Sequence, residues 1–203
     1  HRRRESIRSA LITRYGFDPS QRLIVVALPQ LAEQGVLDWD EHWKEMRFLV
    51  EALTRTGQNV LISLHPRTKS EDYAFLEAEY LCRIAQERLA DFVSAADVFV
   101  ANYSGTVVWA VLCGVRTVVV DFYGLNYTFF DYLRSVVTIR DRSRLDAALQ
   151  NAVHGPAPDF SADWQALSRE QVLDGNTIPR YLSVLQELSQ VPGPQATVTH
   201  SRA

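Results

Sequence analysis

Three short polar segments, each directly after an apolar run, carry the side chains best suited to binding chemistry. They are Pro29-Gln30, His65-Pro66-Arg67 and Asn102-Tyr103-Ser104-Gly105-Thr106. A histidine can donate a hydrogen bond to a phosphate or a sugar hydroxyl, and an arginine offers a fork of donors to an anion. We therefore expect an anion site in which Gln30, Arg67 and Tyr103 are candidate phosphate contacts and His65 is the candidate catalytic residue.

The turn Ser104-Gly105-Thr106 precedes an apolar stretch, Gly105 to Cys113, that we expect to be a helix. The N-terminal amides of a helix are unpaired donors with a partial positive charge, and a glycine lets an anion approach the backbone. With the hydroxyls of Ser104 and Thr106 added, the turn suits a pyrophosphate. The alternative is that Ser104 is only a helix cap and Gly105 only a close-packing residue.

A fourth segment, Phe122 to Tyr127, is rich in aromatic residues. This segment could stack on a base or cover the site. Asp121, Tyr123 and Asn126 are candidate contacts to the bound ligand. Two alternatives stay open here. Asp121 is either a ligand-facing carboxylate or the polar end of a strand, and packing in the core explains Phe129 and Phe130 as well as a binding role does.

The elements that must position these residues alternate between β-branched runs and amphipathic stretches, which is typical of βαβ units with a parallel sheet. We expect strands at Arg22–Leu28, Asn59–Leu64, Tyr80–Ile84, Asp97–Ala101, Val115–Phe122 and Ser135–Ile139. We expect helices at Asp38–Thr56, Ser70–Glu77, Glu87–Ala96, Gly105–Cys113, Ser143–Val153, Asp163–Leu173 and Ile178–Leu188. The helix after Ser104 has almost no polar group, so it should be buried on all faces.

This pattern predicts a three-layer, Rossmann-like α/β domain of about six parallel strands. With strand order 3-2-1-4-5-6, ligands bind where the order reverses, between the first and fourth strands. We expect residues 1–21 to be a linker or lead-in helix, 22–190 the Rossmann-like ligand-binding domain and 191–203 a disordered tail. The absence of an initiator Met suggests a piece of a longer chain.

Composition narrows the classes of function. The formal charge of −3 is too balanced for a nucleic-acid-binding surface, and Arg2-Arg3-Arg4 with Arg8 is expected to be a solvated edge. Cys82 and Cys113 lie in apolar runs, which indicates buried thiols of a reducing compartment. No run reaches the ~20 apolar residues of a membrane span. A cytoplasmic protein is expected, with no metal site.

Several familiar motifs are missing from the sequence. It contains no GxGxxG, no GxxxxGK[ST], no GxSxG and no HExxH. A dinucleotide fingerprint, a phosphate loop, a nucleophile elbow and a zinc-protease helix are thereby excluded. No cofactor is expected.

The order of three short motifs resembles the C-terminal half of GT-B fold sugar-nucleotide enzymes. They are His65-Pro66, Asn102-Tyr103-Ser104-Gly105, and Asp174-Gly175-Asn176 with Arg180. The resemblance extends from about Ile7 to Leu188. The nearest groups are bacterial capsule and teichoic-acid type transferases, including sialyl- and Kdo-transferase relatives, and the UDP-N-acetylglucosamine 2-epimerases.

The resemblance implies a donor-binding domain of a glycosyltransferase that makes bacterial surface polysaccharides. Ser104, Gly105 and Thr106 would hold the phosphates of a UDP, CMP or CDP type donor, and His65 would contact the phosphate or the nucleotide. An N-terminal half, absent from this chain, would supply the site for a polysaccharide acceptor. Peripheral association of the parent protein with the inner face of the membrane is a further expectation.

The sequence departs from the epimerases at two places. It has Pro29-Gln30 where they carry a His-Arg pair, and Trp109 and Ala110 where they carry a Glu-Glu pair for the ribose. These differences favour transferase-like donor binding and leave the base open. An epimerase-like isomerase and a non-catalytic nucleotide-binding module remain the alternatives.

Overall fold

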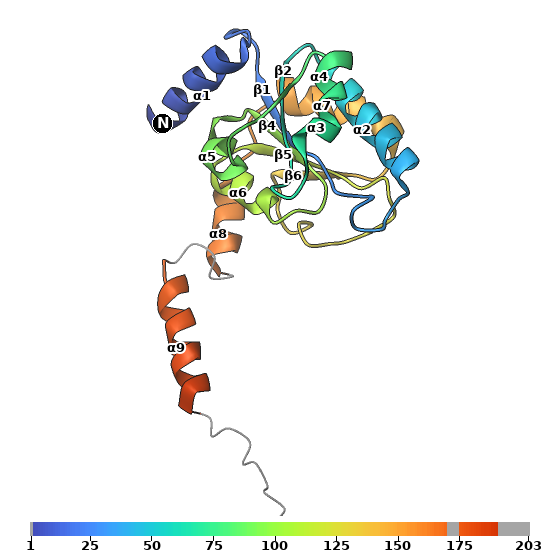
Figure 1. Cartoon of the computed structure of the whole chain (residues 1–203). Coiled ribbons are helices and arrows are strands. Elements are labelled where there is room, and N and C mark those ends of the chain that lie inside the picture. Colours follow the sequence, from blue (N-terminus) through green and yellow to red (C-terminus); the bar gives the residue numbers. More distant parts are fainter. Residues whose placement is uncertain (1, 170–174, 191–203) are drawn as a thin grey trace, which may run out of the picture. The chain divides into compact units, whose positions relative to one another are not determined.

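The sheet of the molecule has the predicted strand order. The computed structural model describes residues 2–169 and 175–190, which divide into two compact units, His1–Asp163 and Trp164–Ala203. The first unit contains a six-stranded sheet in the order β3-β2-β1-β4-β5-β6 (Figure 1). The strand order therefore reverses between β1 and β4, where a ligand was expected.

All strand pairs in the sheet are parallel. The strands are β1 (Leu23–Ala27), β2 (Asn59–Ser63), β3 (Arg83–Ile84), β4 (Val98–Ala101), β5 (Arg116–Val120) and β6 (Val136–Ile139). Strands β2 and β4 are buried along their whole length, because helices cover both faces of the sheet. Strand β3 is shorter than expected, since Leu81 is exposed and only Arg83 and Ile84 pair with β2.

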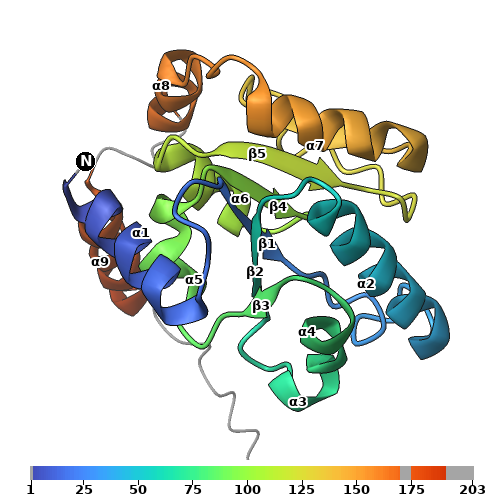
Figure 2. The same ribbon diagram turned by 90° about the horizontal axis from the view of Figure 1, so that it is seen from above.

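Helices form the two outer layers of the first unit. They are α1 (Arg2–Tyr15), α2 (Trp39–Thr54), α3 (Ser70–Tyr73), α4 (Phe75–Glu79), α5 (Leu89–Phe92), α6 (Thr106–Leu112) and α7 (Leu145–His154), with 3₁₀ helices at Val93–Ala95 and Arg142–Arg144. Figure 2 shows α2 and α7 on one face of the sheet and α5 and α6 on the other. The fold is therefore the predicted three-layer, Rossmann-like α/β arrangement.

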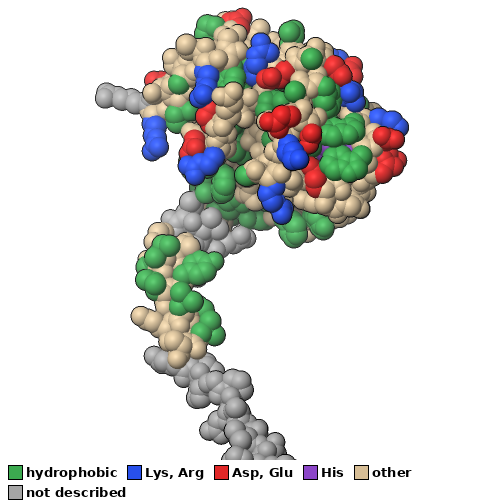
Figure 3. Space-filling model, viewed as in Figure 1, with side chains coloured by type: hydrophobic (Ala, Val, Ile, Leu, Met, Phe, Trp, Pro, Cys, Tyr) green, Lys and Arg blue, Asp and Glu red, His purple; other side chains and the backbone are tan. Residues whose placement is uncertain are grey.

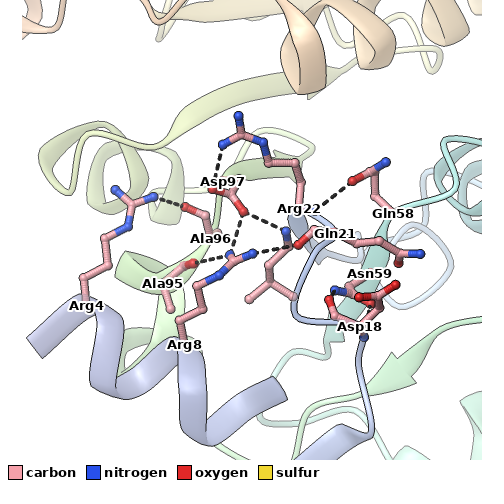
Figure 4. A network of polar contacts seen from close by, with 11 residues as sticks. Arg4, Arg8, Asp18, Gln21, Arg22, Gln58, Asn59, Ala95, Ala96 and Asp97 are labelled. Atoms are coloured by element: carbon pink, nitrogen blue, oxygen red, sulfur yellow. Dashed lines mark hydrogen bonds and ion pairs between the residues drawn. The ribbon is translucent and has the colours of Figure 1, made fainter. Parts of the chain in front are cut away.

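Arginines attach α1 to the rest of the first unit. Arg8 donates to the Asp97 carboxylate (2.6 Å) and to the Ala95 carbonyl (3.4 Å), and Arg4 donates to the Ala96 carbonyl at 2.7 Å (Figure 4). These carbonyls end a 3₁₀ helix, whose last carbonyls have no partner within the helix. The expectation of a solvated basic edge is therefore wrong for Arg4 and Arg8.

Helix α6 is not buried on all faces, contrary to the prediction. Val107, Ala110 and Val111 are fully buried, but 46% of Trp109 is exposed. Cys113, directly after the helix, is exposed as well, so the expected burial of this thiol is wrong. Cys82 is buried as expected, and its burial raises the pKa of the thiol to about 12. Apolar composition alone does not distinguish a helix in the core from one that borders a cleft.

Helix α8 (Ser161–Arg169) begins at the end of the first unit, where the buried Asp163 carboxylate accepts hydrogen bonds from the amides of Arg134 and Ser135 (both 2.7 Å). Helix α9 (Thr177–Gln190) belongs to the second unit and presents exposed apolar side chains: Ile178, Tyr181, Leu182, Val184, Leu185 and Leu188. Asp174 of the expected Asp-Gly-Asn motif and the expected disordered tail at 191–203 lie outside the described residues.

The surface of the first unit carries mixed charge. Figure 3 shows acidic and basic side chains interspersed on one face of this unit. Within residues 2–169 and 175–190, no helix combines the length and the apolar character needed to cross a membrane.

Candidate functional site

A cleft of about 1250 Å³ opens where strands β1, β2 and β4 end. Its lining includes Ala27 and Ser63, the last residues of β1 and β2, and the segment Asn102–Thr106 that follows β4. Ligands of doubly wound sheets bind outside the carboxyl ends of the strands, where the strand order reverses. Small-molecule sites are commonly ~300–1,000 Å³. The cleft is therefore large enough for a nucleotide with a further group attached.

The structure brings six of the predicted site residues to this one cleft. They are Gln30, His65, Tyr103, Ser104, Gly105 and Thr106. The imidazole of His65 and the start of α6 therefore border the same cleft, although they follow different strands, β2 and β4. This arrangement is what the predicted anion site requires.

The imidazole of His65 is oriented by its own turn. Its Nδ1 accepts a hydrogen bond from the backbone amide of Arg67 at 3.2 Å, and the amide of Thr68 donates to the His65 carbonyl at 2.8 Å. An Nδ1 that accepts a hydrogen bond carries no proton, so the neutral ring is protonated on Nε2. The turn therefore presents an N–H donor on an exposed side chain.

Gln30 joins the loop after β1 to the loop after β2. Its Nε2 donates to the hydroxyl of Thr68 at 3.2 Å, and both residues line the cleft. Because the Thr68 amide closes the turn of His65, the contact also braces the imidazole. A direct contact between Gln30 and a ligand stays a prediction.

The start of α6 differs from the expected row of free amides. The amide of Thr106 donates to the Ser104 hydroxyl (3.3 Å), and those of Val107 and Val108 donate to the carbonyls of Ser104 and Gly105. With only seven residues in α6, a helix dipole is not the main attraction for an anion. The hydroxyls of Ser104 and Thr106, which lie 2.8 Å apart, add donors that can turn to a ligand.

Gly105 keeps the entrance to this turn open. It is exposed, and a Cβ added to it would meet no atom within 4 Å. Its φ of −56° is one that any L-residue adopts. The glycine is therefore not needed for close packing or for backbone strain, and the space above it is available to a ligand.

Asp121 follows the last residue of β5 and lies outside the lining of the cleft. The buried carboxylate accepts hydrogen bonds from the amides of Leu125 (3.1 Å) and Asn126 (2.9 Å) and from the hydroxyl of Tyr103 (3.1 Å). Burial and this hydrogen bond raise the pKa of Tyr103. Asp121 therefore organises the loop after β5 and connects it, through Tyr103, to the cleft.

The other candidates lie outside the cleft lining. Tyr123 packs against the core beside Phe122, and burial raises the pKa of its hydroxyl. The amide of Asn126, at φ +52°, is held by Asp121, and its side chain donates to the Gly124 carbonyl. Arg67 follows His65 in an exposed turn. The structure does not bring Arg67, Tyr123 or Asn126 to the lining of the cleft.

Sequence reasoning did not count Trp109 among the site residues. Its side chain lines the cleft one helical turn after Thr106, and it is half exposed. A large aromatic residue at i+3 from the predicted phosphate turn was the signal that could have identified it. Among the residues that the structure describes, no group of three or more His, Cys, Asp or Glu side chains is placed to hold a metal ion.

No protein-family model and no curated protein matches the sequence. Solved structures do match the fold. The glycosyltransferase VinC in complex with DTDP superposes with a TM-score of 0.55 at 13% identity, over 86% of this chain and 44% of that one. The wall teichoic acid polymerase TagF with CDPG gives 0.54 at 13% identity, over 93% and 47%.

A third similar structure belongs to another class of enzyme. The UDP-GlcNAc 2-epimerase of Methanocaldococcus jannaschii, in complex with UDP-GlcNAc and UDP, gives a TM-score of 0.53 at 13% identity, over 82% of this chain and 48% of that one. The chain spans less than half the length of each of these three proteins. Its fold is that of a GT-B C-terminal-like domain.

Proposed function

We propose that the chain binds the diphosphate of a nucleotide-activated sugar or polyol donor, as one half of a glycosyltransferase of bacterial surface polysaccharide synthesis. The observation that carries the proposal is the convergence of His65, Ser104 and Thr106 on one cleft at the strand-order reversal. Similar folds solved with DTDP, CDPG and UDP support it. The acceptor, a polysaccharide, would bind to residues beyond this chain, and the parent protein would work at the inner face of the membrane.

The chemistry follows from the donors in the cleft. When the bond between the transferred group and the phosphate breaks, negative charge grows on the departing nucleotide. The Nε2–H of His65 and the two hydroxyls would stabilise this charge, and preorganised donors of this kind supply much of the catalysis in group transfer. His65 would therefore contribute more to turnover than to donor affinity.

Calorimetric titration with UDP, CDP and CMP tests the proposal. We expect the wild-type chain to bind at least one of them, and His65→Ala to bind it about tenfold more weakly, as expected for a lost charge-assisted hydrogen bond. His154→Ala, which removes an exposed histidine outside the cleft lining, is the matched control and should bind as the wild type does. Absence of binding to all three nucleotides at millimolar concentration would refute the proposal.

The fold similarity to a UDP-GlcNAc 2-epimerase favours an isomerase as the second candidate. NMR analysis of the products that the full-length parent forms from UDP-N-acetylglucosamine distinguishes the two. Appearance of N-acetylmannosamine or its UDP form would replace the transferase proposal. The third candidate, a non-catalytic binding module, predicts nucleotide binding without turnover in that same full-length parent.

A further inference from the structure

Trp109 occupies an unusual position for a large apolar side chain. It lines the cleft from α6 and lies on the side of the helix that points away from the fully buried Val107 and Val111. Among the described residues no aromatic ring or cation stacks on its indole, although 46% of the residue is exposed. A flat ring in a concave site, without a protein partner, is a surface on which a planar ligand group can stack.

The distance along α6 indicates which part of a donor would reach this ring. Trp109 is three residues after Thr106, so it lies on the same side of the helix and roughly 4.5 Å further along the axis. A donor whose phosphates contact Ser104 and Thr106 would place the next group of the molecule, not the phosphates, beside the indole. The cleft lining also includes the small side chains of Ala85 and Ala90, from the segment that follows β3.

The chemistry of α6 also indicates how that group would be recognised. The helix has the sequence TVVWAVL and carries no charged side chain. This side of the cleft therefore offers a ring and no charge, and every nucleobase has a π-face that an indole can cover. Stacking does not read the hydrogen-bonding edge of a base, so it selects for the presence of a base more than for its identity.

We propose that Trp109 holds the nucleoside of the donor by stacking, an inference that rests on the proposed nucleotide site. The ligand class is then a nucleoside diphosphate with loose selection of the base. UDP, CDP and dTDP should bind within about fivefold of one another, and pyrophosphate, which has no ring, should bind more weakly.

Calorimetric titration of Trp109→Ala with UDP and with pyrophosphate separates this inference from the proposed function. Loss of one base–aromatic stack weakens binding about tenfold or more. We therefore expect that loss for UDP, no change for pyrophosphate, and near-wild-type UDP binding by Trp109→Phe. The matched control is Trp39→Ala, which removes a half-exposed tryptophan outside the cleft.

A fluorescence titration with Trp109→Phe tests the same role of Trp109 in case Trp109→Ala does not fold. UDP should quench part of the emission of the wild type, and this quenching should be lost in Trp109→Phe while UDP affinity is kept. Wild-type UDP affinity in Trp109→Ala, or equal losses for UDP and pyrophosphate, would overturn the role of Trp109 and leave the nucleotide site standing. A wild-type chain that binds no nucleotide would overturn both.

Discussion

At the scale of single residues, Gly105 is important because of the space it leaves open. The backbone φ at this position is one that any residue adopts, and a Cβ added here has no atom within 4 Å beyond the neighbouring residues of the chain. Gly105→Val should therefore change the free energy of unfolding by no more than about 1 kcal/mol, the usual cost of losing a favourable cap residue. Its branched side chain would stand where the phosphates approach, so UDP affinity should fall at least tenfold by calorimetry. Gly105→Ala is the graded control, and full affinity in the valine variant would place the phosphates elsewhere.

His42 provides a test of stability against pH. It is fully buried on α2, where its Nε2 is 2.8 Å from the Tyr73 hydroxyl and its Nδ1 has no hydrogen-bond partner among the described residues. Burial lowers its pKa below the ordinary value of 6.5, and Glu33 opposes this only partly. The folded protein thus resists protonation more than the unfolded chain does. Its contribution to stability is complete above pH 6.5 and is lost as the pH falls toward the lowered pKa.

Thermal unfolding between about pH 7.5 and pH 5.5 measures this effect. The wild type should melt at lower temperature as the pH falls, and His42→Gln, which cannot titrate, should show a smaller decrease over the same interval. If the two proteins lose the same number of degrees, another group controls the acid sensitivity.

At the scale of elements, the attachment of α1 depends on a few charged contacts. Arg8 pairs with Asp97 and also donates to two backbone carbonyls, those of Ala95 and Gln21. Arg8→Ala removes these donors and leaves a partly buried carboxylate with fewer partners, so it should lower the free energy of unfolding by about 1.5–3 kcal/mol. Urea unfolding measures this loss, and Arg3→Ala, an exposed arginine of the same helix, should cost much less. Equal costs for the two variants would mean that α1 is held by something other than Arg8.

The loop after β5 depends on one buried carboxylate. Asp121→Ala would remove the acceptor of the Leu125 and Asn126 amides and of the Tyr103 hydroxyl. Hydrogen bonds to a charged group contribute about 1.5–3 kcal/mol each, and these three are only partly buried, so we expect a loss of about 2 kcal/mol and faster hydrogen exchange in this loop. Asp121→Asn keeps one acceptor oxygen and should lose less. Unchanged exchange at Leu125 and Asn126 would show that the loop is held by other contacts.

The exposure of α6 and the role of Asp121 in this loop could not be decided from the sequence, for related physical reasons. An apolar helix is favoured equally by a core and by the wall of a cleft, so the pattern of α6 did not predict the exposure of Trp109. An aspartate at a strand end can bind a ligand or its own backbone, and only the path of residues 122–127 decides between the two. Strands β1, β2, β4 and β5 were predictable because helices on both faces of a parallel sheet require continuous apolar runs.

At the scale of the whole molecule, the position of the cleft followed from topology. The alternation of strands and helices predicted a parallel sheet. Because strand–helix–strand connections are almost always right-handed, only a few strand orders are possible. The segments after β1, β2 and β4 therefore had to meet at one edge, as Gln30, His65 and Ser104 do. The hydrogen bonds at the start of α6 depend on the local path of the backbone, which the spacing of apolar residues in the sequence does not predict.

The central claim is that this edge of the sheet binds a nucleotide diphosphate, and a ¹H–¹⁵N NMR titration of the 203-residue chain with UDP tests it most directly. The account predicts chemical-shift changes at the backbone amides of Arg67, Gly105 and Thr106 and at the indole N–H of Trp109, with α1 and α7 unaffected. A spectrum that is unchanged at millimolar UDP, or whose changes gather away from these residues, would contradict it.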